Sequence, residues 1–92
     1  MKTLYSKEEL VKHLTDELED ELEGIMKYED VYNSFVSLDL REEAAMVESI
    51  ANDEYNHACM LWDILKKHDV DLTKHEKIQR DWECVKTIFH IK

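Results

Sequence analysis

Asp53-Glu54-Tyr55-Asn56-His57, read together with Asp20-Glu21-Leu22-Glu23, is the pattern on which the prediction of the fold depends. A Glu and a His three residues apart lie one turn apart on the same face of a helix, so Glu54 and His57 can bind one ligand together. Carboxylate-bridged pairs of metal ions in helix bundles are held by such pairs and by further Glu residues from neighbouring helices. The pair alone is a weak signal in a chain rich in Glu. Whether it marks a metal site therefore has to be judged from the positions of these residues within their helices.

Composition predicts a small helical protein. The 92 residues include one Gly and no Pro, and they are rich in Glu, Leu and Lys. Such a chain favours helices with few tight turns, and its length suits one domain, residues 1–92, near the size at which oligomerisation commonly adds stability. We therefore expect an all-α fold.

Charge and apolar content exclude some partners. The formal net charge is -10, and the pI is about 4.8. Nucleic acids and anionic membranes bind basic surfaces, so neither is expected as a partner, and a cation is the natural ligand. Two Cys without a regular framework indicate reduced thiols, and no apolar run approaches the ~20 residues of a membrane span. We expect a soluble, cytoplasmic protein.

Capping patterns and apolar periodicity predict three helices. Ser6-Lys7-Glu8-Glu9, Asp39-Leu40-Arg41-Glu42 and Thr73-Lys74-His75-Glu76 each have the form of a capping box. Apolar residues then recur at steps of three and four, which predicts helices over residues 7–36, 40–68 and 73–90. The short connection near residue 38 makes the first two an antiparallel hairpin. The third helix is amphipathic, and the sequence leaves open whether it covers this hairpin or another subunit.

Three polar residues interrupt the apolar stripes of this hairpin. Glu21 lies among Leu and Ile on the first helix, and Glu54 and His57 lie in a comparable line on the second, where both are expected to face inward. Glu21 is about 17 residues before the turn and Glu54 about 16 after it, so at ~1.5 Å per residue both lie about 25 Å from the turn. Buried carboxylates are costly unless they are paired or bind a metal. The sequence therefore predicts a shared cation site.

One hairpin supplies only half of a di-iron site of the bundle type. The third helix has no second Glu-x-x-His, because Leu72 and Thr87 stand three places before His75 and His90. Two chains related by a two-fold axis would supply four Glu and two His and would complete a four-helix bundle. We expect a homodimer with two metal ions, one per chain.

These residues resemble a known family. Glu21 with Tyr28 seven places on, followed by Glu54-x-x-His57-Ala58, is similar to the half-bundle motif of rubrerythrin-like ferritins, and residues 16–68 look closest to encapsulated ferritins. The resemblance implies a ferroxidase that oxidises Fe(II) with dioxygen or peroxide for iron storage inside an encapsulin nanocompartment, often as a ring of dimers. It implies that Glu54 bridges two irons, that Glu21 and His57 are terminal ligands, and that Tyr28 is a hydrogen-bonding or redox neighbour.

The resemblance also implies an outer metal entry site, at which this chain has Asp20 and Glu23. The chain differs from the family in two respects. No apolar docking tail of the family's kind follows Phe89, which leaves encapsulation open, and no Cys-x-x-Cys pair is present to hold a rubredoxin iron, which argues against a full rubrerythrin peroxidase.

Other interpretations remain open. Glu21, Glu54 and His57 could belong to a hydrated polar face, residues 16–23 to a solvated acidic face, and Tyr28 to the core. The chain would then be an acidic helical dimerisation or adaptor module without catalysis. A di-iron peroxidase or oxygenase acting on a small molecule would use the same ligands. Zn, Mn or Co could also occupy such ligands in place of iron.

Overall fold

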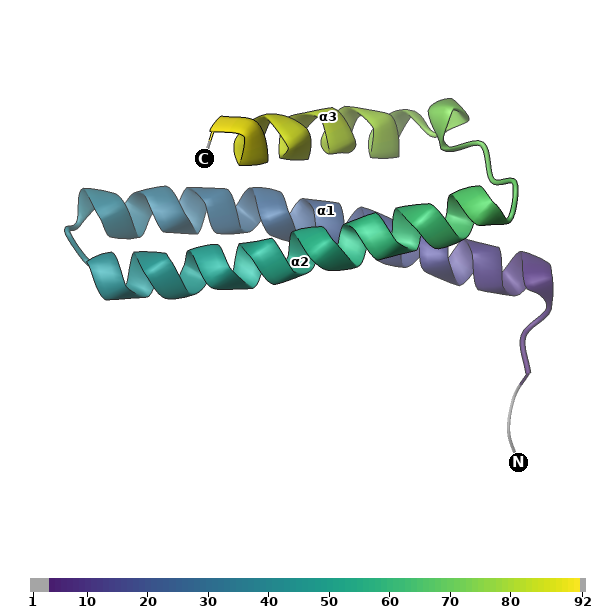
Figure 1. Cartoon of the computed structure of the whole chain (residues 1–92), viewed down its shortest axis with the longest axis horizontal. Helices are drawn as coiled ribbons and strands as arrows, with labels where there is room; N and C mark the ends of the chain where they lie inside the picture. Colours follow the sequence, from purple (N-terminus) through teal and green to yellow (C-terminus); the bar gives the residue numbers. More distant parts are fainter. Residues whose placement is uncertain (1–3, 92) are drawn as a thin grey trace.

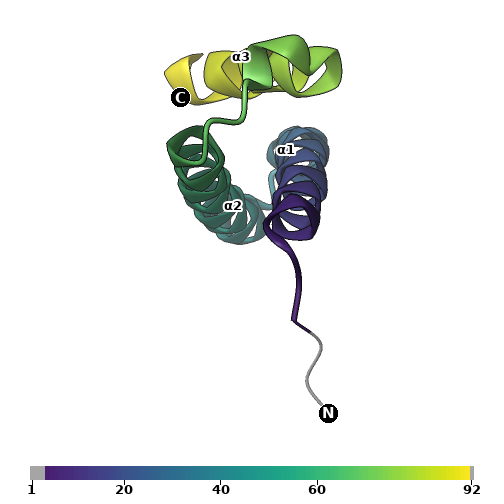
Figure 2. The same cartoon turned by 90° about the vertical axis from the view of Figure 1, so that its right-hand side faces the viewer.

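Three α-helices and one short 3-10 helix make up the part of the chain that the structure describes. This computed structural model describes the backbone of residues 4–91 and the side chains of residues 4–89. The elements are α1 (Lys7–Ser37), α2 (Arg41–Lys67), the 3-10 helix η1 (Leu72–Lys74) and α3 (Glu76–Ile91) (Figure 1). The two long helices form an antiparallel hairpin, and α3 lies along one side of it (Figure 2). The all-α prediction of a hairpin with a shorter third helix is confirmed.

The start of α1 follows the predicted capping box. The Ser6 hydroxyl accepts a hydrogen bond from the Glu9 backbone N–H at 3.1 Å. The Ser6 N–H in turn donates to the Glu9 carboxylate at 3.0 Å. Two of the N–H groups that a helix start leaves without a backbone partner are thereby satisfied. The first helix begins where local chemistry alone predicts it.

The turn between α1 and α2 differs from the prediction. Asp39 is not the N-cap of α2, because Leu40 occupies that position and provides no side-chain hydrogen bond. Asp39 instead ends α1 in the left-handed conformation, with φ of 59°. Its N–H donates to Val36 O at 3.0 Å, and the Leu40 N–H donates to Phe35 O at 2.9 Å. This pair of bonds is a Schellman motif, with Asp in the place where Gly is usual.

The second turn repeats this arrangement. Asp69 has φ of 63°, and the N–H groups of Asp69 and Val70 donate to Lys66 O and Leu65 O, each at 3.1 Å. The predicted capping box at Thr73 is wrong. Thr73 lies inside η1, where its N–H donates to the Asp71 carboxylate at 3.1 Å, and α3 begins only at Glu76. Asp71, two residues before Thr73, is therefore the N-cap residue here, because its side chain accepts the hydrogen bond from the Thr73 N–H.

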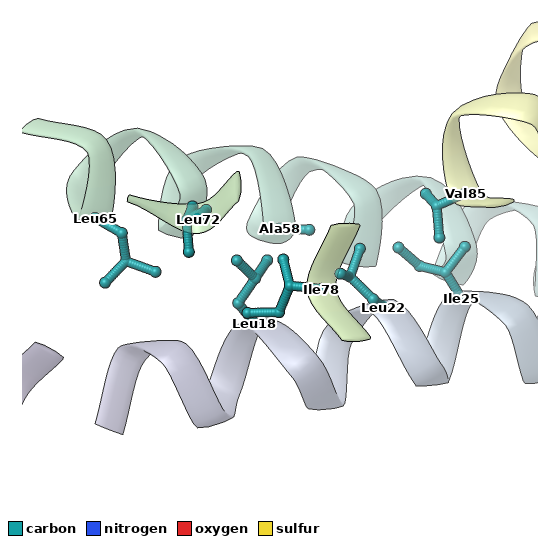
Figure 3. Close-up of a cluster of buried hydrophobic side chains, with 8 residues drawn as sticks. All are labelled: Leu18, Leu22, Ile25, Ala58, Leu65, Leu72, Ile78 and Val85. Atoms are coloured by element: carbon teal, nitrogen blue, oxygen red, sulfur yellow. The ribbon is translucent and has the colours of Figure 1, made fainter. Parts of the chain in front are cut away.

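One apolar core joins all four elements. Its buried side chains come from one stripe of α1, one stripe of α2, the 3-10 helix and the inner face of α3 (Figure 3). They are Leu18, Leu22, Ile25, Ala58, Leu65, Leu72, Ile78 and Val85. Small Ala58 on α2 lets the helices approach closely, while the larger residues interdigitate around it. Burial of these side chains is what holds the hairpin and α3 together.

Polar and aromatic contacts fix which side of the hairpin α3 covers. Lys77 forms an ion pair with Glu23 of α1, and His75 Nε2 lies 3.0 Å from a Glu19 carboxylate oxygen. On the other helix, the rings of Trp62 and Trp82 stack with centroids 4.6 Å apart. The third helix therefore folds back on its own hairpin, which settles the point that the sequence leaves open.

Among the described helices, none combines the length and the apolar character that crossing a membrane requires.

Candidate metal centre

The hairpin brings together the three residues that sequence reasoning singles out. Glu21 comes from the middle of α1, and Glu54 and His57 come from the middle of α2. Each offers one ligand atom, and these atoms all lie within 4.8 Å of one another. The Nδ1 atom of His57 is 3.9 Å from the Oε1 atom of Glu21. Equal distances from the turn along two antiparallel helices produce this meeting, as the 1.5 Å rise requires.

Burial differs across the group. The Glu21 side chain is only 13% exposed, whereas that of His57 is 53% exposed. Glu54 is half-buried. The expectation that His57 faces inward is therefore wrong within a single chain. Helix α2 is shielded only on the sides that α1 and α3 cover, and the His57 side chain lies outside those sides.

The environment of Glu21 opposes its ionisation. Its pKa is raised from 4.5 to about 7, first by burial and then by hydrogen bonding with and repulsion from Glu54. Glu17 and Asp20 add smaller repulsions. Among the described residues, Glu21 Oε2 is buried and makes no hydrogen bond. Two close carboxylates with an unsatisfied oxygen can be stabilised by a proton or by a cation.

The group lies on the side of the hairpin opposite to α3. Residues seven or eleven apart on a helix share a face, so Leu10, Leu14, Glu21 and Tyr28 of α1 form one row, and Met46, Ile50, His57 and Ile64 of α2 form another. We call these two rows the open face. Its apolar members include some of the most exposed in the structure, with Met46 at 68%, Leu10 at 46%, Ile64 at 42% and Ile50 at 41%. An apolar surface of this kind with acids at its centre is typical of a site completed by another molecule.

Gly24 lies directly beside the carboxylates. A Cβ atom built at this position would be 3.9 Å from Glu54 Oε2, which is ordinary van der Waals contact. Its φ is not positive, so the helix backbone does not require glycine here. The residue leaves the flank of the Glu54 carboxylate open.

The remaining predicted site residues lie outside the group. Tyr28 is half-buried two turns from Glu21, and no hydrogen bond within the described residues joins it to the carboxylates. Asp20 is exposed, and Glu23 turns toward α3, where it pairs with Lys77. Sequence reasoning missed Glu17, one turn before Glu21, whose charge contributes to the raised pKa. The spacing of four residues was the signal that could have found it.

Comparisons with protein-family models, with curated proteins and with solved structures found no match.

Proposed function

We propose that two copies of this chain pair through their open faces to form a ferritin-like four-helix bundle with a di-iron ferroxidase centre. Fe(II) is the substrate, and Fe(III) for storage is the product. In each chain Glu21, Glu54 and His57 hold the metal. The observation that carries this proposal is the convergence of their three ligand atoms, within 4.8 Å, in the middle of an exposed apolar surface.

The chemistry of these residues supports a cation. Two carboxylates that repel one another, one with a pKa near 7, are stabilised when a positive ion lies between them. The buried Oε2 of Glu21 has no hydrogen-bond partner among the described residues, and a metal would supply one. Carboxylate and imidazole ligands suit iron, with Zn, Mn and Co as competitors.

The number of ligands supports a site shared by two chains. One chain offers two carboxylates and one imidazole, which is half of the set that holds two irons in a ferritin-like bundle. A two-fold axis through the open face supplies the other half, and the exposed apolar side chains around the site become buried in the same step. Glu54 is then suited to bridge the two metals, with Glu21 and His57 as terminal ligands.

The reaction is a two-electron transfer. Two Fe(II) ions each give one electron to dioxygen, which takes up two protons and leaves as hydrogen peroxide. The protein contributes the carboxylates that stabilise the additional charge of Fe(III) and the imidazole that completes the ligand set. Tyr28, on the same face, remains a predicted hydrogen-bonding or redox neighbour of the centre.

The experiment is iron oxidation by the purified chain. Apo protein is mixed with Fe(II) in air, Fe(III) absorbance is followed, and native mass spectrometry counts the metals. We expect oxidation well above the protein-free rate and two metals per two chains. Glu54→Ala should lower the initial rate roughly 100-fold and weaken the dimer, because a bridging ligand is lost.

The matched control is Asp63→Ala, which removes an exposed acid from the same helix, about 100° away from the row of the open face that contains Ile64. It should leave the rate unchanged. Oxidation by Glu54→Ala at the wild-type rate would contradict the assignment of the site.

A second function is an acidic helical dimerisation or adaptor module without catalysis. The exposed apolar residues of the open face favour it, because such a surface needs a partner whether or not a metal is bound. A stable dimer that neither binds nor oxidises Fe(II) would support this alternative. Storage inside an encapsulin shell and assembly into a ring of dimers stay predictions from the family resemblance.

A further inference from the structure

A groove opens between the two helices at the end of the hairpin remote from the turn. It has a volume of about 140 Å³, and its apolar walls come from Leu10, Val11 and Leu14 of α1 and from Ile64 and Leu65 of α2. Leu10 and Ile64, which are exposed, belong to the open face. An apolar cavity of roughly 150 Å³ holds a benzene molecule. The groove is therefore the size of one large apolar side chain.

The groove and Met46 lie on opposite sides of the metal-binding group. Leu10 is three turns before Glu21, or about 17 Å, and Ile64 is two turns after His57, or about 11 Å. Met46 is three turns before His57, about 17 Å away in the direction of the turn. It is the most exposed apolar side chain of the open face, at 68%. A two-fold axis through the group and perpendicular to the helices would place Met46 of each copy over the groove of the other.

Charge distinguishes this orientation from the parallel one. Residues 29–48, around the turn, carry six acidic residues and one Arg. Residues 7–16 and 60–69, at the other end, carry five acidic residues and four Lys. A parallel pair would set two strongly acidic turns side by side. An antiparallel pair places each acidic turn beside the lysines of the other copy.

We propose that the two copies pack antiparallel across the open face and that Met46 of each copy inserts into the groove of the other. This inference rests on the proposed shared metal site and adds the direction of the partner and the side chain that fixes it. Met is unbranched and flexible, so it fills an irregular apolar groove well. Two equivalent contacts flank the metals on either side and exclude water from the centre of the interface.

Crosslinking tests the direction. In a chain with Cys59→Ser and Cys84→Ser, M46C and I64C are prepared separately and treated with a short bismaleimide, alone and as a re-equilibrated mixture with Zn²⁺. An antiparallel pair brings M46C of one copy next to I64C of the other, so only the mixture should give a crosslinked dimer. A dimer from M46C alone or from I64C alone would show a parallel pair and overturn the proposal.

Substitution tests the groove contact. Met46→Glu should weaken the Zn²⁺-loaded dimer by roughly tenfold or more in sedimentation velocity, because a charge would have to enter an apolar groove. Ala45→Glu is the control, since this exposed neighbour points about 100° away from Met46 on the helix. Equal weakening by both, or by neither, would contradict the contact.

These outcomes separate the inference from the proposed function. A mixture-specific crosslink in a protein that does not oxidise Fe(II) would support the antiparallel interface and contradict the ferroxidase function. Iron oxidation with two metals per dimer, together with a parallel crosslink, would support the ferroxidase function and contradict the antiparallel interface.

Discussion

The Glu21 carboxyl group lies where ionisation is opposed from several sides. Burial is the largest effect, and the carboxylate of Glu54 adds hydrogen bonding and repulsion. The same features that raise its pKa make it a good partner for a metal, since a cation removes the repulsion that a proton otherwise relieves. One measurement on the apo protein reports this directly.

Stability of the apo protein should fall as pH rises from about 4.5 to above 7. The pKa of Glu21 is raised on folding to about 7, so the folded state binds the proton more tightly and the stabilisation is lost as pH passes through 7. Glu21→Gln should remove this part of the pH dependence in urea unfolding with a chelator present. An unchanged slope in the variant would show that other groups cause it.

Asp39 and Asp69 each end a helix in the left-handed conformation, with φ of 59° and 63°. Left-handed backbone costs a residue with a Cβ atom roughly 1–2 kcal/mol, and Gly avoids this cost. Asp69→Gly should therefore raise the free energy of unfolding by about 1 kcal/mol, measured by thermal or urea unfolding.

Asp39→Gly should give a similar gain, less a small loss from its exposed ion pair with Arg41. Asp69→Ala is the control and should not stabilise the protein, because Ala retains the Cβ atom. Destabilisation by Asp69→Gly would contradict this account of the helix end.

Helix α1 runs for 31 residues with a glycine near its middle. Gly in a helix interior loses about 1 kcal/mol relative to Ala, because its backbone is freer in the unfolded chain. The space at Gly24 accommodates a Cβ atom at 3.9 Å from Glu54 Oε2. Packing within one chain therefore does not require glycine at position 24.

Gly24→Ala should raise the free energy of unfolding of the apo chain by about 1 kcal/mol, measured by urea unfolding. Gly24→Leu serves as the comparison, since its longer side chain would reach the Glu54 carboxylate and should lower the rate of iron oxidation. A destabilised Gly24→Ala chain would show that the helix needs the missing side chain for another reason.

The two faces of the α1–α2 hairpin differ in what covers them. Helix α3 covers one face of the hairpin through Lys77 and the stacked Trp82, and His75, just before α3, adds a contact to Glu19. The opposite face carries Glu21, Glu54 and His57, the proposed metal ligands, together with exposed apolar residues. Folding within one chain thus covers one face, and in the proposed dimer a second copy would cover the other.

Thermal unfolding should consequently depend on metal and on protein concentration together. A metal that binds only the folded dimer stabilises it by about 2.7 kcal/mol at roughly 100 times its Kd. With Zn²⁺, the midpoint should rise with protein concentration, and Glu54→Ala should lose both effects. A Zn²⁺ effect that is independent of protein concentration would point to a site within one chain.

Local sequence patterns were enough to predict much of the fold. The Ser6 cap and the helical spacing of apolar residues predicted α1 and α2 to within one residue at each end. Hydrogen bonds and side-chain periodicity within a few residues determine these features, so they can be read without knowing the rest of the molecule. The constant rise per residue also placed Glu21 and Glu54 at the same level.

Contacts between distant segments decided the rest. The sequence by itself determined a helical hairpin with a pair of carboxylates and an imidazole at its middle, because helix period and rise are properties of the local backbone. Only the tertiary structure decided that Asp39 ends a helix instead of starting one, that α3 covers the face bearing Glu23, and that His57 stays exposed. The positions of α3 and of His57 depend on which long-range contacts pack best, and that competition leaves no local pattern in the chain. At Asp39 two local arrangements compete, a capping box and the Schellman bonds to Val36 and Phe35, and the sequence pattern alone does not choose between them.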